Sequence, residues 1–414
     1  ELIPVVDEMR AKKNDVSKQV PTIEGDAKEK AIAEMKELNE TLKAKEDELA
    51  SIEVEWKKRQ LLLPGLPLDV VPVGKDDTEN VEIKKEGDPS ITLGVTPPDP
   101  DKMLDHVALG EALDIIDIPR GVKIGGSRFY FLKGDGARLE LAVLQYTIDK
   151  LVQKGFTLFI PPVLANYDAM MGTSYFPGGE EQAYAVGVDR DPADQCVNVS
   201  MCQCDNKDAC TCADKKEIEA DNLFLIGTSE VAVASYHSGE TLKLDDSPKC
   251  YCGVSNCFRR EAGTYGKDTH GLYRIHQFQK VEQVILCEND PQVSAAMHAE
   301  ILGNAEEVLQ DLKLPYRVVD VCTGDMGQGQ AYKNDIECWM PSRESYGETH
   351  SCSTFYEFQS RRLNLKYEKA DGSKEFVHTL NNTCIASPRI LIPILEMYQN
   401  ADGSVTIPEV LRSY

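Results

Sequence analysis

The stretch FRREAGTYGKDTHGLYRIHQFQKVE, residues 258–282, decides the fold that we expect for this chain. It contains most of a strand-like run, NCFRREA at residues 256–262, then a loop with Gly263, Gly266 and Gly271, and then the start of a second strand-like run, YRIHQFQKVEQVIL at residues 273–286. Two strand-like runs joined by a glycine-bearing loop predict a β-hairpin. Such a hairpin would bring Arg259 and Arg274 together on one ligand.

The side chains of this stretch suit a nucleotide that lies beside an amino acid. Arginine binds phosphate through two parallel, charge-assisted hydrogen bonds. Glu261 is an acceptor for an amino group, Phe278 offers a flat face for a base, and Glu282 can pair with an ammonium group. From the residues alone, an exposed hairpin with ordinary surface ion pairs, each worth little, remains an alternative.

The whole chain has 414 residues, which favours two or three domains. It contains no run of 18 apolar residues and no signal peptide, so we expect a cytoplasmic protein without a membrane span. The sequence begins Glu1-Leu2-Ile3-Pro4 without Met, so we expect it to start inside a longer gene product. A formal net charge of −24 argues against a generic basic nucleic-acid binder but leaves room for a local basic site.

Residues 1–63 have the pattern of a charged helical hairpin. Apolar residues recur every three or four positions, with Lys45 in one seam position: Met35, Leu38, Leu42, Leu49, Ile52 and Trp56. Pro21 and Gly25 break the helical pattern. We therefore predict an N-terminal antiparallel coiled-coil hairpin. A helical oligomerisation arm without a ligand is the alternative.

The rest of the chain predicts an α+β fold. The proline-rich segment LLLPGLPLDVVPVGKDD, residues 61–77, ends the arm, and a linker and loop are expected over 64–104. Strand-like runs then alternate with two amphipathic helical segments, residues 137–155 and 291–312. Hairpin-like spacings favour an antiparallel β-sheet with flanking helices as the core of a domain at 105–414.

All thirteen cysteines follow residue 195, and an odd number scattered in this way argues against a disulfide framework. An insertion at about 190–216 holds two C-x-C pairs, Cys202, Cys204, Cys210 and Cys212. Four thiolates could hold one Zn²⁺ ion, although this spacing differs from the usual C-x-x-C knuckle. The alternative is a polar surface insertion of free thiols.

Residues 258–282 resemble motif 2 of class II aminoacyl-tRNA synthetases, in the form found in seryl-tRNA synthetases. Four further segments are similar to the same family: GFTLFIPPVL at 155–164 (motif 1), GTSE at 227–230 (the serine loop), ECWMPSRESYGETHSCST at 337–354, and HTLNNTCIASPRILIPILE at 378–396 (motif 3). The chain departs from the family at His270, usually arginine, at His350, usually serine, and at Thr354, usually asparagine. The cysteine-rich insertion is also not a general family feature.

The resemblance implies a serine–tRNA ligase. Such an enzyme activates L-serine with ATP to seryl-adenylate and transfers serine to the 3′ end of tRNA(Ser), with tRNA(Sec) as a further candidate acceptor. The implied catalytic residues are Arg259, Arg389 and Glu282. The implied ATP site consists of Arg259, Arg260, Glu261, Arg274, Ile275, Phe278, Glu348, Ser351 and Arg389. The implied serine site consists of Thr228, Ser229, Glu230, Arg259, Glu282, Asn381 and Thr383.

The resemblance also implies partners and a metal. Glu348 and Ser351 would bind Mg²⁺ that bridges the phosphates. Motif 1 would form the interface of a homodimer. The N-terminal arm would bind the tRNA. Lysines near the hairpin tip are candidates for RNA contacts, or else ordinary solvated charges: Lys12, Lys13, Lys18 and Lys28. Two alternatives are a ligase that loads an amino acid onto a carrier protein, whose relatives lack such an arm, and a non-catalytic paralogue. The intact Arg259, Glu261, Glu282 and Arg389 argue against the paralogue.

Overall fold

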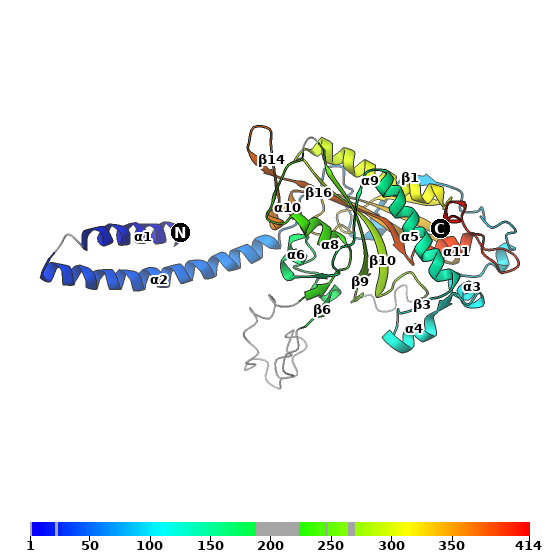
Figure 1. The fold of residues 1–414 in the computed structure, drawn as a ribbon, viewed down its shortest axis with the longest axis horizontal. Helices are drawn as coiled ribbons and strands as arrows, with labels where there is room; N and C mark the ends of the chain where they lie inside the picture. Colours follow the sequence, from blue (N-terminus) through cyan, green and yellow to red (C-terminus); the bar gives the residue numbers. More distant parts are fainter. Residues whose placement is uncertain (1, 21–23, 188–222, 245–246, 264–269) are drawn as a thin grey trace. The chain divides into compact units, whose positions relative to one another are not determined.

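The computed structural model describes residues 2–20, 24–187, 223–244, 247–263 and 270–414 (Figure 1). These residues form two compact units, one that ends at Pro64 and one that runs from Gly65 to Tyr414. The four cysteines predicted as zinc ligands, and the tip of the glycine loop at 264–269, lie outside the described residues.

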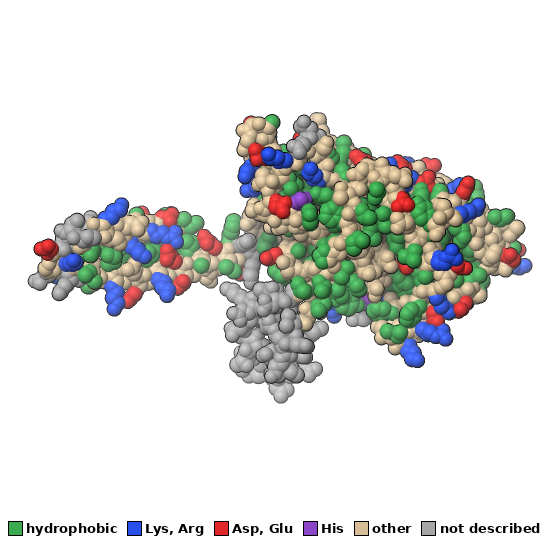
Figure 2. All heavy atoms as spheres, in the orientation of Figure 1, with side chains coloured by type: hydrophobic (Ala, Val, Ile, Leu, Met, Phe, Trp, Pro, Cys, Tyr) green, Lys and Arg blue, Asp and Glu red, His purple; other side chains and the backbone are tan. Residues whose placement is uncertain are grey.

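The first unit is a pair of antiparallel helices, α1 (Leu2–Gln19) and α2 (Asp26–Leu61). Val6 and Leu42 are buried between them, and Arg10 Nε lies 2.8 Å from Glu46 Oε1. The predicted seam positions Ile52 and Trp56 are 52% and 62% exposed, because they lie beyond the part of α2 that α1 covers. The helical hairpin is confirmed, and Figure 2 shows acidic and basic side chains interspersed along its surface.

The second unit is built on an eight-stranded sheet in the order β1-β11-β12-β13-β16-β10-β9-β4. Its strands are β1 (Val81–Glu86), β4 (Thr157–Phe159), β9 (Lys249–Phe258), β10 (Gln277–Cys287), β11 (Tyr316–Asp320), β12 (Tyr332–Met340), β13 (Ser345–Tyr356) and β16 (His378–Ser387). All neighbours are antiparallel except β4, which pairs with β9 in parallel. The predicted antiparallel α+β core is therefore confirmed.

Two long helices, α5 (Asp135–Gln153) and α9 (Pro291–Asp311), lie side by side across one face of this sheet (Figure 1). Asp290 caps α9 by accepting a hydrogen bond from Gln292 N at 2.7 Å, with Pro291 at the first helical position. The buried side chains of both helices join those of the sheet in one core that includes Val143, Val281 and Ile301. Each such fully buried side chain contributes about 1.5–3 kcal/mol of transfer free energy.

Shorter elements complete the second unit. The remaining helices are α3 (His106–Ala112), α4 (Ile118–Gly125), α6 (Tyr167–Gly172), α8 (Glu230–Ala234), α10 (Phe358–Leu363) and α11 (Leu391–Met397). The remaining strands are β2 (Ile116–Asp117), β3 (Phe131–Leu132), β5 (Leu164–Ala165), β6 (Tyr184–Val186), β7 (Leu223–Leu225), β8 (Thr241–Leu242), β14 (Lys366–Glu368) and β15 (Lys374–Phe376). None of the described helices is long and apolar enough to cross a lipid bilayer.

Two expectations about secondary structure were wrong. The segment predicted as loop over 64–104 contains β1, an edge strand whose six residues are all exposed, so no buried face produces an alternating apolar pattern. The two strands of the opening hairpin also do not reach as far into the loop as predicted, to residue 262 on one side and from residue 273 on the other. β9 ends at Phe258 and β10 begins at Gln277. Glu261 adopts a left-handed conformation with φ of 52°, which a continuing strand does not allow.

Candidate functional site

The candidate site lies on the sheet face opposite α5 and α9. Gln283 of β10 points to the helices, because its Nε2 donates to Ile301 O in α9 at 2.9 Å. Side chains alternate along a strand, so Phe278, Lys280 and Glu282 point to the other face. There they line two adjoining recesses, and five residues line both of them: Arg259, Lys280, Glu348, Ser351 and Thr383. The two recesses therefore form one continuous site.

The first recess is lined by two arginines, Arg259 and Arg389. Its lining includes seven of the predicted ATP-site residues: Arg259, Glu261, Ile275, Phe278, Glu348, Ser351 and Arg389. The guanidinium carbon of Arg259 lies 5.3 Å from the Phe278 ring centroid, and Arg259 Nε lies 3.4 Å from Gly227 O. The predicted hairpin thus brings a charged guanidinium and an aromatic face together.

Arg389 enters the first recess from the end of β16. Its Nε donates to Tyr273 O at 3.0 Å, and its Nη1 donates to Glu348 O at 2.8 Å. Its guanidinium carbon also lies 4.4 Å from the Tyr273 ring centroid. These contacts hold the planar group in one orientation, which suits a site for phosphate oxygens.

Two of the predicted ATP-site residues do not line either recess. Arg274 Nη1 pairs with Glu261 Oε2 at 2.7 Å, and Arg274 is absent from the lining of both recesses. The Arg260 side chain is exposed, while its backbone N–H donates to Gln182 O at 2.9 Å. The first recess is therefore lined by Arg259 and Arg389, and not by the predicted pair Arg259 and Arg274.

Glu348 and Ser351 share one face of β13 because of a β-bulge. The pairing with β12 shifts between Ile336 and Glu337, which leaves Thr349 as the extra residue. Loss of water would raise the pKa of Glu348, but the positive charges of Arg389, Lys333, Arg259 and Arg274 outweigh this effect and lower the pKa. The ionised Glu348 carboxylate and the Ser351 hydroxyl are hard oxygen donors, which fits Mg²⁺. In the described part of the chain, this site included, no group of three or more His, Cys, Asp or Glu side chains is arranged to hold a metal ion.

His350, which departs from the family, lies between these two residues and also lines the first recess. It is 1% exposed, and its Nδ1 lies 2.7 Å from Thr349 Oγ1. Burial lowers its pKa to about 4, so the ring is neutral at neutral pH. The substitution therefore adds no positive charge beside Glu348.

The second recess contains two buried carboxylates, Glu230 of α8 and Glu282 of β10, which are 5% and 2% exposed. Burial raises the pKa of Glu230 to about 7, and the negative charge of Glu282 is the second largest cause of this rise. Glu230 accepts hydrogen bonds from Tyr175 Oη at 3.1 Å and from Gln359 Nε2 at 2.7 Å. Glu282 is paired with Lys280 Nζ at 2.7 Å and accepts from Thr383 Oγ1 at 3.2 Å.

The predicted serine-site residues fall into two groups. Arg259, Glu230, Glu282, Asn381 and Thr383 line the second recess. Thr228 and Ser229 are buried behind it. Thr228 Oγ1 accepts from Glu230 N at 3.4 Å, and Ser229 Oγ donates to Gly253 O at 3.2 Å. These two residues orient the start of α8 and thereby Glu230.

Sequence reasoning missed Lys280, Tyr175 and Gln359. The alternation from Phe278 to Glu282 along one strand was a signal that could have placed Lys280 in the site. Tyr175 and Gln359 are 55 and 129 residues away from Glu230 in the chain, and their spacing carries no such signal.

Comparisons with known proteins agree with this fold. The profile of the tRNA synthetase class II core domain (G, H, P, S and T) matches residues 212–398, so the second unit has the catalytic fold of class II aminoacyl-tRNA synthetases. The profile of the seryl-tRNA synthetase N-terminal domain matches residues 1–67. A serine–tRNA ligase of Deinococcus radiodurans is 41% identical over 410 residues, which cover 99% of this chain and 87% of the relative. The chain belongs to the seryl-tRNA synthetase family, and the resemblance identified from its motifs is confirmed.

Solved structures give the same result. The seryl-tRNA synthetase of Pyrococcus horikoshii complexed with ATP is 33% identical with a TM-score of 0.81, and the match covers 100% of this chain and 88% of that one. The cytoplasmic serine–tRNA ligase of Naegleria fowleri in complex with AMP is 30% identical with a TM-score of 0.77, at the same coverage.

Proposed function

We propose that this chain is a serine–tRNA ligase that uses ATP and a divalent metal ion. The observation that carries the proposal is the junction of the two recesses, where Arg259 and Lys280 lie between the recess that contains Arg389 and a pair of buried carboxylates. An anionic nucleotide and a small ammonium compound would meet at this junction. Family membership makes the ammonium compound L-serine and the acceptor tRNA(Ser), with tRNA(Sec) as a further candidate.

In the first step, a serine carboxylate oxygen attacks the α-phosphorus of ATP and the bond to pyrophosphate breaks. Arg259 would stabilise the negative charge that develops on the α-phosphate. Arg389 would hold the β- and γ-phosphates, and Arg274 would hold Glu261 in place to accept a hydrogen bond from the adenine amino group. Phe278 would stack on the base, with Ile275 beside it. Catalysis of this kind consists of positioning and charge stabilisation.

In the second step, a ribose hydroxyl at the tRNA 3′ end attacks the seryl carbonyl and AMP leaves.

Serine itself would be bound in the second recess. Glu282 would bind its ammonium group, which would replace the ammonium group of Lys280. Glu230, Asn381 and Thr383 would surround the serine hydroxyl. A site whose polar groups bond that hydroxyl rejects alanine strongly, because those groups would be left unpaired.

The metal in this proposal is Mg²⁺. Glu348 and Ser351 would hold it, and it would supply positive charge to the phosphate oxygens. A Zn²⁺ ion at the four cysteines of the insertion stays a prediction, because those residues lie outside the described part of the chain.

The first unit is the proposed tRNA-binding arm. Its support is the matched N-terminal domain and the exposure of Lys12, Lys18 and Lys28, with Lys13 half-buried. A cytoplasmic location is also part of the proposal, supported by eight free cysteines among the described residues.

We further propose a homodimer through α5 and β4. Four apolar side chains on or next to these elements are 44–85% exposed: Leu141, Val152, Leu158 and Ile160. Exposed apolar side chains that gather on neighbouring elements mark interaction surfaces. Ile160→Asp should lower the molar mass measured by sedimentation, and an unchanged mass would contradict this interface.

The function is tested by serine-dependent ATP–pyrophosphate exchange, with threonine, alanine and glycine as controls. Exchange with serine alone would establish the first step without any tRNA. Exchange with serine but no charging of tRNA(Ser) would favour a carrier-protein ligase, and no exchange with any amino acid would indicate a non-catalytic paralogue.

A further inference from the structure

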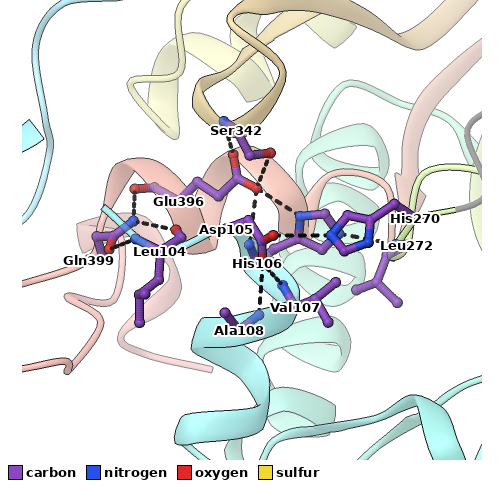
Figure 3. Close-up of polar contacts among 10 residues, drawn as sticks. All are labelled: Leu104, Asp105, His106, Val107, Ala108, His270, Leu272, Ser342, Glu396 and Gln399. Carbon is purple, nitrogen blue, oxygen red and sulfur yellow. Dashed lines mark hydrogen bonds and ion pairs between the residues drawn. The ribbon is translucent and has the colours of Figure 1, made fainter. Parts of the chain in front are cut away.

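Glu396 of α11 is a fully buried carboxylate that joins three segments of the second unit (Figure 3). Its Oε1 accepts hydrogen bonds from His106 N at 3.0 Å and from Ser342 Oγ at 2.7 Å, and its Oε2 accepts from Ser342 N at 2.9 Å. A buried charge is tolerated only when it is bonded in this way. Glu396 therefore fixes the start of α3 and the turn around Ser342 against α11.

His106 connects this carboxylate to the end of the glycine loop. Its Nε2 accepts a hydrogen bond from Leu272 N at 3.1 Å, so its other ring nitrogen, Nδ1, carries the proton and donates to Glu396 Oε1 at 2.7 Å. The ring lies close to the loop backbone, since a Cβ atom on Gly271 would be 2.0 Å from His106 Nε2. Gly271 also has φ of +68°, so glycine is needed here for two reasons.

The residue after Leu272 contacts the candidate phosphate-binding arginine. Arg389 donates to the carbonyl oxygen of Tyr273 at 3.0 Å and lies over its ring. Arg343, next to Ser342, also lies over this ring, with its guanidinium carbon 4.1 Å from the centroid. Both ends of the Glu396 network thus reach Tyr273: one through His106 and Leu272, the other through Ser342 and Arg343.

We propose that His106 is a positioning residue for ATP. It fixes the Leu272–Tyr273 backbone through Nε2 and thereby sets the orientation in which Arg389 meets the β- and γ-phosphates. His106 lines neither recess, so it acts through Tyr273 and Arg389 rather than on the substrate. The inference rests on the proposed function, because that proposal gives Arg389 its role.

Two variants test the roles of the two ring nitrogens of His106 separately. His106→Gln places its amide oxygen near the position of Nε2, so it keeps an acceptor for Leu272 N–H and loses the donor to Glu396. His106→Asn keeps a donor near Nδ1 and loses the acceptor. We expect His106→Asn to weaken ATP binding about tenfold, the usual effect of one lost buried hydrogen bond. Binding of AMP, which lacks the β- and γ-phosphates, and of serine should change by less than about twofold, and His106→Gln should bind ATP like the wild type.

Hydrogen exchange of the peptide that contains Leu272 gives a second readout without any substrate. Its amide should exchange faster in His106→Asn than in the wild type or in His106→Gln. Unchanged exchange in His106→Asn would overturn the inference. So would equal losses of ATP binding in both variants, or a loss that extends equally to AMP and serine, since either would indicate general destabilisation. A wild-type protein that binds ATP no more tightly than AMP would instead contradict the proposed role of Arg389, while the amide exchange would still test the contact with His106.

Discussion

The ammonium nitrogen of Lys280 lies 2.7 Å from Glu282 Oε2, and the two side chains are only 7% and 2% exposed. Lys280 Nζ also lies 3.2 Å from Thr383 Oγ1. In the proposed function, the ammonium group of serine binds this same carboxylate. On this proposal, Lys280 would serve as the cation of Glu282 until serine replaces it, and its ammonium group would then be free to meet the serine carboxylate or the α-phosphate.

Lys280→Met should destabilise the protein in a way that serine repairs. Removal of one partner of a buried ion pair costs about 3–5 kcal/mol of the free energy of unfolding. Serine should then raise the melting temperature more in this variant than in the wild type, because its ammonium group replaces the lost cation. Thermal unfolding with and without serine measures both effects.

The matched control is Lys333→Met. Lys333 forms a similar pair with Asp335 at 3.0 Å, with side-chain exposures of 13% and 7%, but Asp335 does not line the second recess. This variant should be destabilised without a larger response to serine. An equal response in both variants would contradict the exchange of cations at Glu282.

Arg259→Ala should abolish adenylate formation while the protein stays folded. Arg259 is half-buried at the junction of the recesses, and loss of one preorganised charge donor costs about 10²–10³ in kcat. Pyrophosphate exchange measures the loss, and circular dichroism checks the fold. Arg361→Ala, which removes a 61% exposed arginine of α10, should leave the exchange rate within about twofold. Wild-type activity in Arg259→Ala would refute the proposed role of the opening hairpin.

The stability of Glu230→Gln relative to the wild type should be higher at alkaline pH than at acidic pH. Burial raises the pKa of Glu230 to about 7 from an ordinary value of 4.5, so the folded state holds a proton that the unfolded state releases. The contribution of this group to stability is complete below pH 4.5 and is lost as the pH rises through 7. The full loss is about 3 kcal/mol, since one pKa unit corresponds to about 1.4 kcal/mol.

Urea unfolding of the wild type and of Glu230→Gln at pH 5 and pH 8 measures this difference. The variant should gain stability relative to the wild type between these two values. Glu368→Gln, which changes an exposed carboxylate, should show no such change. A difference between Glu230→Gln and the wild type that does not depend on pH would mean that Glu230 ionises normally.

The sequence predicted those parts of the site that lie within one continuous motif. Arg259, Phe278 and Glu282 were recognised because their chemistry and the resemblance to motif 2 are visible over 25 consecutive residues. Tyr175 and Gln359 were not, because only tertiary packing brings them to Glu230. The same limit applies to His106, which meets Leu272 across 166 residues of chain.

Motif resemblance also does not specify which way a side chain points. Arg260 is adjacent to Arg259, but its side chain is exposed and lines neither recess. Thr228 and Ser229 lie behind the second recess because the short helix α8 turns only Glu230 into it. Both side-chain directions depend on backbone geometry that neither the amino-acid composition nor the hydrophobic periodicity of the sequence predicts.

Removal of residues 1–64 should separate the two steps of the reaction. The residues that line both recesses belong to the second unit, which begins at Gly65 and contains its own sheet and core. A protein that starts at Gly65 should therefore keep serine-dependent pyrophosphate exchange within a few-fold, about the variation expected for distant changes. Charging of tRNA(Ser) should fall by orders of magnitude, because the proposed arm supplies the RNA contacts.

Charge reversal at the arm is the finer version of this experiment. Replacement of Lys12, Lys18 and Lys28 by Glu leaves the helices in place but removes three exposed positive charges. If the arm binds RNA phosphates, this variant should raise KM for tRNA and make it less sensitive to salt, since each lost phosphate contact removes part of the salt dependence. Full charging by the shortened protein would show that another surface reads the tRNA. A normal KM in the lysine variant, with charging still lost in the shortened protein, would instead place the RNA contacts elsewhere on the two helices.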